Sequence, residues 1–154
     1  MPYIDQLTTE YLTGGKTRMM QLATAVNGQP WCCTVYYAVD SDLNLIWIST
    51  PDRCHSQAIT ENSNIAGAIA YDQQPGSQPF VQGLQFEGVA TMLTGDEEAA
   101  AAQTYAEQLH RKDDLLADIR SGKNPHKVYK VHVSKYVLFD SKNFPEQPRQ
   151  EWAR

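Results

Sequence analysis

The sequence contains no apolar run that approaches the roughly 20 residues needed to cross a bilayer. Its first residues also lack the basic segment followed by an apolar one that marks a secretory signal. Cysteine is scarce, with three residues, and two of them, Cys32 and Cys33, are adjacent, which does not suit a disulfide framework. These absences predict a cytoplasmic protein without a membrane segment.

Positive charge is also in short supply. The chain has 13 Lys and Arg against 18 Asp and Glu, a net charge of −5, and the cations are dispersed. Nucleic acid is therefore not an expected partner. The 154 residues are 42% hydrophobic and 20% charged, which is typical of a globular protein, and no linker divides them. We expect one domain over residues 1–154.

The cysteines and histidines do not predict a metal site. Adjacent residues of a strand point to opposite faces, so Cys32 and Cys33 cannot grip one ion together. Their spacing to Cys54 and His55 fits no common zinc pattern. A reactive thiol at Cys54, at the start of a helix, is an alternative use of that residue. The remaining histidines are expected to be surface or structural residues: His110, His126 and His132.

The order of apolar periods predicts consecutive strands rather than strands alternating with helices. The strands are expected at Thr17–Val26, Trp31–Val39, Leu45–Ile48, Ile65–Tyr71 and Phe80–Leu93, then at Val128–Val133 and Tyr136–Asp140 as one long strand or two. Helices are expected at Tyr3–Leu12, Thr50–Asn62, from Thr94 to Leu109 and at Asp113–Arg120. This pattern predicts an α+β fold in which an antiparallel sheet of about six strands closes into a barrel flanked by helices.

Local signals mark the turns and caps. Asn27-Gly28 predicts a tight hairpin, since both residues favour positive φ. Thr50 is the expected N-cap of its helix with Pro51 at the first helical position, and Asp52 is the competing cap. Thr94 and Glu97 fit a capping box. Residues 72–79 are expected to form a loop, and the glycines within Phe80–Leu93, Gly83 and Gly88, indicate a bulge, a barrel bend or close approach of a ligand.

The segment from Thr50 to Ser56 predicts an anion site. It places hydroxyls, Arg53 and His55 at a helix start, where backbone N–H groups lack partners. Arg53 and His55 would clamp a phosphate by charge-assisted hydrogen bonds, and a protonated His55 would tighten the anion as the pH falls. The alternative is a solvated helix start with incidental polar residues.

Four segments together resemble the pyridoxamine 5′-phosphate oxidase-like split-barrel flavoproteins. They are the hairpin NGQPWCCTVYY, the strand LIWIST with the helix CHSQAITEN, the strand IAGAIAYD, and the run VQGLQFEGVATML, and the closing VYKVHVSKYVLFD fits the last strands. The resemblance covers about residues 19–141. It implies FMN as the cofactor and a homodimer with the cofactor groove at its interface.

The resemblance also assigns the site residues. It implies phosphate-binding hydroxyls at Ser49 and Thr50, a cation at His55, where the family usually has lysine, and a flavin-contacting amide at Gln82 or Gln85. Cys54 stands where arginine is frequent, and Arg53 lies one residue before it. For each glutamine the alternative is an outward residue on a half-exposed strand.

The departures from the family pattern restrict the reaction. An arginine that often opens the second strand is missing, as are the paired C-terminal arginines of true pyridoxamine phosphate oxidases. We therefore predict a flavin-dependent oxidoreductase acting on another small molecule, not on vitamin B6. No residue is an evident general acid or base, so the sequence assigns no catalytic residue. The alternatives are a binding module for flavin or another planar or phosphorylated ligand, and a structural dimer with a decayed site.

Overall fold

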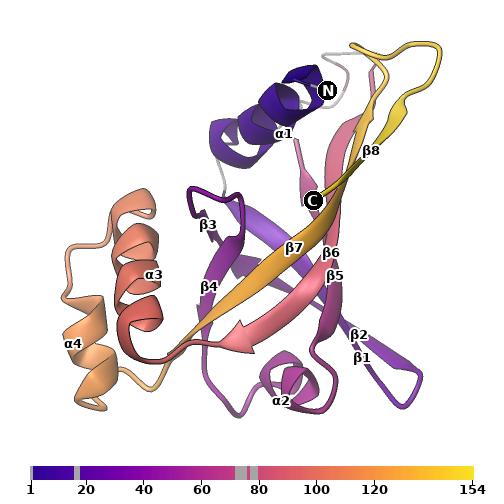
Figure 1. Cartoon of the computed structure of the whole chain (residues 1–154). Helices are drawn as coiled ribbons and strands as arrows, with labels where there is room; N and C mark the ends of the chain where they lie inside the picture. The colour runs from indigo at the N-terminus through magenta and orange to yellow at the C-terminus, as the bar shows by residue number, and fades with distance from the viewer. Residues whose placement is uncertain (1, 16–17, 72–75, 77–79) are drawn as a thin grey trace.

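The protein is described from a computed structural model, which covers residues 2–15, 18–71, 76 and 80–154 (Figure 1). Its helices are α1 (Pro2–Gly14), α2 (Cys54–Glu61), α3 (Gly95–Gln108) and α4 (Leu115–Arg120). Its strands are β1 (Met19–Val26), β2 (Gln29–Tyr36), β3 (Ala38–Val39), β4 (Leu45–Ser49), β5 (Asn64–Ala70), β6 (Gln82–Met92), β7 (Lys127–Asp140) and β8 (Arg149–Ala153). Most of the loop expected at residues 72–79 lies outside the described residues.

The strands form one curled antiparallel sheet in the order β2-β1-β5-β6-β7-β4-β3, with β8 added to β7. The two ends of this order, β2 and β3, are consecutive in the chain and are joined at Tyr37. The sheet therefore curls back on itself, and the α+β split-barrel prediction is confirmed. The strand expected at Trp31–Val39 is divided at Tyr37 into β2 and the short β3, and among the described residues β8, in the C-terminal tail, is a strand that was not expected.

Two apolar cores hold this arrangement. The inner face of the sheet packs around Trp47, Tyr37 and Tyr136, which are at most 1% exposed. Helix α1 lies at one end of the barrel and α2 at the other (Figure 1). The second core lies outside the sheet, where α3 and α4 bury Tyr105 and Ile119 against β3, β4 and β7.

A β-bulge explains why β7, which is one strand, has the apolar pattern of two separate strands. Glu87 pairs with Lys135 and Gly88 pairs with Val133, so Ser134 of β7 has no partner on β6. The extra residue shifts the alternation of inward side chains by one position. At Gly88 a Cβ atom would lie 2.2 Å from the backbone oxygen of His132. The glycine thus permits close strand approach at the bulge.

The predicted cap of α2 is wrong, whereas Thr94 is the N-cap residue of α3 as predicted but without the side-chain hydrogen bond of a capping box. Helix α2 begins at Cys54 with Arg53 as N-cap and no side-chain cap, because residues 50–53 form a turn in which Arg53 N–H donates to the Thr50 carbonyl at 3.2 Å. The hydroxyl of Thr50 instead donates to Asp52 Oδ1 at 2.5 Å, so neither residue caps the helix. Thr94 makes no side-chain cap either, since Gly95 follows it with φ of 64° and breaks the regular entry to the helix.

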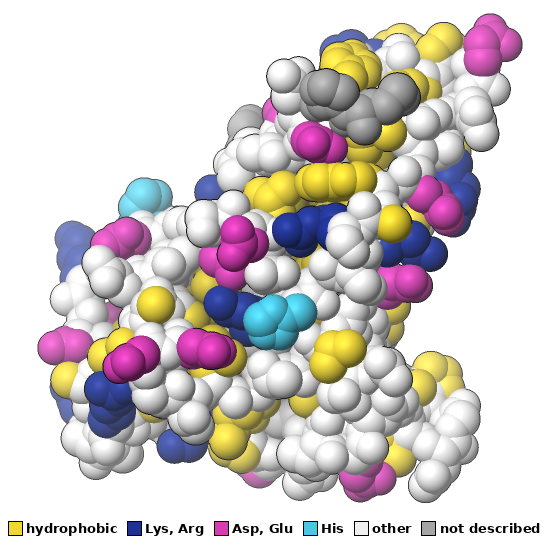
Figure 2. Space-filling model, viewed as in Figure 1, with side chains coloured by type: hydrophobic (Ala, Val, Ile, Leu, Met, Phe, Trp, Pro, Cys, Tyr) yellow, Lys and Arg dark blue, Asp and Glu magenta, His cyan; other side chains and the backbone are white. Residues whose placement is uncertain are grey.

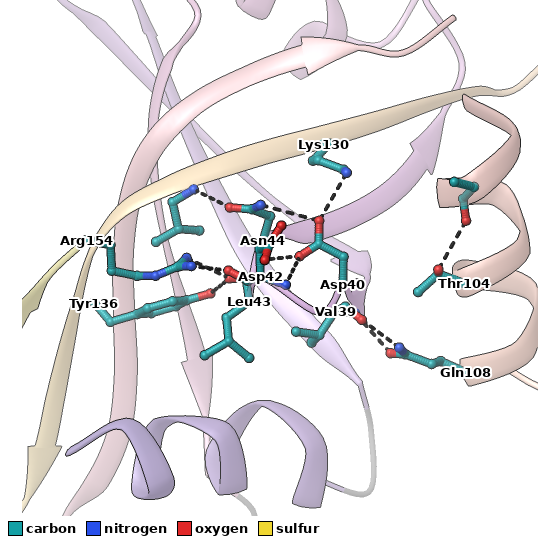
Figure 3. A network of polar contacts seen from close by, with 12 residues as sticks. Val39, Asp40, Asp42, Leu43, Asn44, Thr104, Gln108, Lys130, Tyr136 and Arg154 are labelled. Atoms are coloured by element: carbon teal, nitrogen blue, oxygen red, sulfur yellow. Dashed lines mark hydrogen bonds and ion pairs between the residues drawn. The ribbon is translucent and has the colours of Figure 1, made fainter. Parts of the chain in front are cut away.

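Polar contacts converge on the turn between β3 and β4 (Figure 3). Asp40 Oδ2 lies 3.0 Å from Lys130 Nζ, and Asn44 Oδ1 accepts from Val133 N–H at 3.1 Å. Tyr136 donates its hydroxyl to the Leu43 carbonyl at 2.6 Å. Arg154 of the tail donates to carbonyls of the same turn. The Asn44 amide thus accepts a backbone hydrogen bond from the part of β7 that lies between its pairings with β4 and β8.

Gln108, at the end of α3, hydrogen-bonds to the edge of β3, which is the last strand in the sheet order (Figure 3). Its Oε1 accepts from Val39 N–H at 2.9 Å, and its Nε2 donates to the Val39 carbonyl at 2.6 Å. The Gln108 amide therefore satisfies the two backbone groups of Val39 that a neighbouring strand would otherwise bond.

Removing this amide tests its contribution to stability. Gln108→Ala is expected to lower the free energy of unfolding by about 1–3 kcal/mol, since two backbone groups lose their partners. Gln103→Ala, on the exposed side of the same helix, is the control and should change it by less than about 0.5 kcal/mol. Urea denaturation measures both, and equal losses would contradict the assigned role.

The face of the molecule in Figure 2 carries charges of both signs. On the face in Figure 2, acidic and basic side chains are interspersed, and apolar side chains gather in a short band below the C-terminal end of α1 and near β8. Among the described helices none has both the length and the apolar content needed to cross a membrane.

Candidate functional site

The last residue of β4 and the first turn of α2 meet in a buried polar contact. Ser49 Oγ and His55 Nε2 lie 2.7 Å apart, and the two residues are 6% and 8% exposed. The turn at residues 50–53 reverses the chain and brings the imidazole back over the strand end. His55 is therefore a partner of Ser49 rather than a side chain that projects into solvent.

The exposed turn of this corner carries one cation, Arg53, and next to it the carboxylate of Asp52. Arg53 is exposed as the N-cap of α2, and its guanidinium makes no ion pair with a described residue. Thr50 is half-buried beside it. The structure thus brings together four of the six predicted site residues, Ser49, Thr50, Arg53 and His55, which we call the β4–α2 corner.

Two titratable side chains near the corner favour their neutral forms. Burial, and then the charge of Arg53, lower the pKa of His55 below its ordinary value of 6.5. Burial raises the pKa of Cys33 to about 11, with smaller contributions from Cys32 and Cys54, so this thiol is protonated at neutral pH. His55 is consequently uncharged near pH 7, and Arg53 is the cation of the α2 start.

The two predicted glutamines lie on different faces of β6. Gln82 points to the α1 end of the barrel, where its amide donates to the Tyr11 hydroxyl at 2.8 Å and to Asp140 Oδ1 at 3.3 Å. Gln85 is exposed on the outer face, in a row with Ala68 and Gln21 across three strands. A shallow, mainly apolar hollow of about 400 Å³ lies along this row.

Neither glutamine is near the β4–α2 corner of the same chain. Seven residues of β6 separate Gln85 from Met92, which is level with Tyr129 and Trp47. At about 3.3 Å per residue this is roughly 23 Å along the strand, and Ser49 lies two residues further. Gln85 therefore does not line the β4–α2 corner of its own chain.

The structure adds two residues that were not predicted as site residues. Lys127, the first residue of β7, pairs with Ser49 of β4. His126, which precedes it, has its pKa lowered by burial and then by Arg111 and Arg53, so Arg53 is close enough for its charge to act there. The sequence contains no local signal for either residue, because β4 and β7 are nearly 80 residues apart.

The buried imidazole predicts a pH-dependent stability. His55 has a lower pKa folded than unfolded, so the unfolded state binds more protons as the pH falls below about 6.5, and stability decreases there. His55→Gln keeps a hydrogen-bonding group for Ser49 but cannot titrate. Urea unfolding from pH 7.5 to pH 5 should therefore depend less on pH in the variant, and identical dependence would mean that the imidazole titrates as it does in the unfolded chain.

Comparison with known proteins gives the family. The family model described as pyridoxamine 5′-phosphate oxidase matches residues 7–139. The chain belongs to this family. It is not a true pyridoxamine phosphate oxidase: the paired arginines are missing, and the C-terminal Arg149 and Arg154 are bound to Glu151 and to the β3–β4 turn.

A relative and two solved structures illustrate the similarity. A UPF0306 protein of Serratia proteamaculans is 28% identical over 94 residues, which are 60% of this chain and 64% of that protein. The chain therefore matches less than two thirds of this relative's length. A heme-binding protein from Mycobacterium smegmatis superposes with a TM-score of 0.70 at 17% identity, over 93% of this chain and 55% of the other.

An FAD-binding protein from Mesorhizobium loti superposes with a TM-score of 0.66 at 18% identity, over 86% of this chain and 89% of the other. At such identities the two structures establish a shared fold, and the ligands belong to those proteins.

Proposed function

We propose that the protein binds FMN as a homodimer and carries out a flavin-dependent redox step on a small molecule in the cytoplasm. The observation that carries the proposal is the β4–α2 corner: a buried Ser49–His55 pair, a hydroxyl at Thr50 and, at Arg53, a guanidinium without an ion pair to a described residue. These groups suit a phosphate, which prefers hydrogen-bond donors and a cation at a helix start. Family membership makes a flavin phosphate the leading candidate.

The proposed homodimer gives Gln85 a role in the site. This amide is too far from the corner of its own chain, but a second copy could bring its Gln85 to the ring of a flavin whose phosphate lies at the first chain's corner. The outer face supports such pairing, because β1 and β5 present small side chains there, Ala23, Ala66, Ala68 and Ala70. Exposed Tyr36, 56% accessible, lies on the same face of the neighbouring β2, opposite exposed Met19 of β1. Contiguous apolar surface of this kind favours a protein interface.

The protein's own contribution to the reaction would be binding and orientation. When bound, the isoalloxazine ring supplies the electron transfer, and the chain holds the phosphate and excludes water from the ring. None of the described corner residues has the placement of a general acid or base toward a substrate, so we assign no catalytic residue. A flavin-binding protein without turnover is the alternative that this absence favours.

An absorbance spectrum of the purified protein tests the proposal. We expect flavin bands either as isolated or after addition of FMN, together with quenched flavin fluorescence. Bleaching of the flavin bands by NADH or NADPH and their recovery in air would favour an enzyme. Flavin bands that persist would favour a flavin-binding protein without turnover. A Soret band, as from heme, with no uptake of FMN would contradict the proposed cofactor. Light scattering during gel filtration measures the oligomer, and a monomer at micromolar concentration would contradict the shared site.

A further inference from the structure

We propose that Lys127 supplies the second cation of the β4–α2 corner, taking the place of the lysine that the family usually has at the position of His55. The inference rests on the proposed function and concerns a residue outside the family's phosphate motif. It makes the corner a site built from three segments: the end of β4, the start of α2 and the start of β7.

The strand register places Lys127 beside Ser49. The two residues are paired across β4 and β7, so their side chains leave the sheet on the same face with Cβ atoms about 4.5–5.5 Å apart. The neighbouring pair confirms this face, since Trp47 and Tyr129 stack inside the barrel with ring centroids 5.4 Å apart. Lys127 therefore emerges next to the hydroxyl that was predicted to bind the phosphate.

The charge of Lys127 is not used elsewhere in the described chain. Its side chain is exposed and makes no ion pair with a described residue, whereas Lys130, three residues on, is held by Asp40 at 3.0 Å. On the other side of the corner, Arg53 acts on both His55 and His126, the residue next to Lys127. Two cations that make no ion pair with a described residue thus flank the strand end.

The first turn of α2 also holds an enclosed hydroxyl beside His55. Ser56, in the first turn of α2, is 2% exposed, and its Oγ has no hydrogen-bond partner among the described residues. His55 is neutral and bonded to Ser49. In this proposal His55 orients the Ser49 hydroxyl, and Arg53 and Lys127 provide the positive charge that binds a phosphate.

One acidic side chain opposes the anion. Asp52 is exposed at the turn and accepts from the Thr50 hydroxyl. Its negative charge repels a phosphate, and it occupies a hydroxyl that the phosphate could use. Asp52→Asn should therefore tighten FMN several-fold, the opposite effect to the loss of Lys127.

Fluorescence titration with FMN and riboflavin tests the assignment, since only FMN has the phosphate. Lys127→Gln should weaken FMN about tenfold and leave riboflavin within about twofold. Lys142→Gln is the matched control, an exposed lysine after β7, at the α1 end of the barrel, without an ion pair to a described residue. If Lys127→Gln binds FMN like the control, or loses both flavins equally, the inference is overturned and the proposed function stands.

A second measurement separates the two proposals if the wild type takes up no FMN. Proton NMR of the His55 and His126 imidazoles can be followed during titration with inorganic phosphate. Shifts in the wild type that vanish in Lys127→Gln would support the anion site although FMN is not its ligand. The absence of shifts in the wild type would overturn both.

Discussion

Arg53→Gln is expected to weaken FMN binding about 10- to 100-fold, because a phosphate loses a charge-assisted hydrogen bond worth about 1.5–3 kcal/mol. Riboflavin, which has no phosphate, should bind the variant nearly as well as the wild type. Arg53 is the exposed N-cap of α2 and holds no structural ion pair with a described residue, so the fold should be unaffected. Fluorescence titrations with the two flavins measure the ratio.

The control for this prediction is Arg120→Gln, at the C-terminal end of α4. Its guanidinium lies 3.3 Å from Glu98, and it should not affect either flavin. The double variant Arg53→Ala with His55→Ala should lose FMN further, since Ser49 is no longer held. Equal losses of FMN and riboflavin in the Arg53 variants would place the phosphate away from this corner.

Gly88→Ala is expected to destabilise the protein by more than about 3 kcal/mol. The added methyl group would lie 2.2 Å from the carbonyl oxygen of His132 and 2.9 Å from its carbonyl carbon, both backbone atoms of the adjacent strand. Relief requires separation of β6 from β7 at the bulge, with loss of ladder hydrogen bonds on both sides. Thermal or urea unfolding measures the loss.

Gly83→Ala, on the same strand, is the control. There the methyl group would meet only the Ile69 carbonyl oxygen, at 3.8 Å, which is ordinary contact. We expect a change of less than about 1 kcal/mol, because alanine costs less conformational entropy than glycine. A Gly88 variant as stable as the Gly83 variant would show that the strands can move apart at little cost.

Local signals in the sequence were sufficient to predict most of the helices and strands. The hairpin at Asn27-Gly28 forms as predicted, with φ of 51° and 78° and Val26 paired with Gln29. The cap of α2 was wrong because Asp52 binds the Thr50 hydroxyl, and Thr94 is the N-cap of α3 without a side-chain hydrogen bond, since Gly95 alters the entry to the helix. The tail was not predicted as a strand, since β8 exists only through its pairing with β7 and the packing of Trp152 on Tyr136.

The candidate site was predictable only where its residues are close in sequence. Ser49 and His55 are six residues apart, and a strand end followed by a helix start was enough to bring them together. Lys127 joins them through the β4–β7 register, which no local pattern specifies. The sequence could not decide between Gln82 and Gln85, because both are amide side chains that precede Gly88 on the same predicted strand. The partners of Gln82, Tyr11 and Asp140, come from distant segments and fix it at the barrel end.

The most direct test of the account is a crystal structure of the protein grown with excess FMN. We expect the phosphate at the β4–α2 corner, bonded to Ser49 or Thr50 and flanked by Arg53 and Lys127, with Gln85 of a second copy at the ring. Flavin bound elsewhere, or none at that corner, would contradict the central claim.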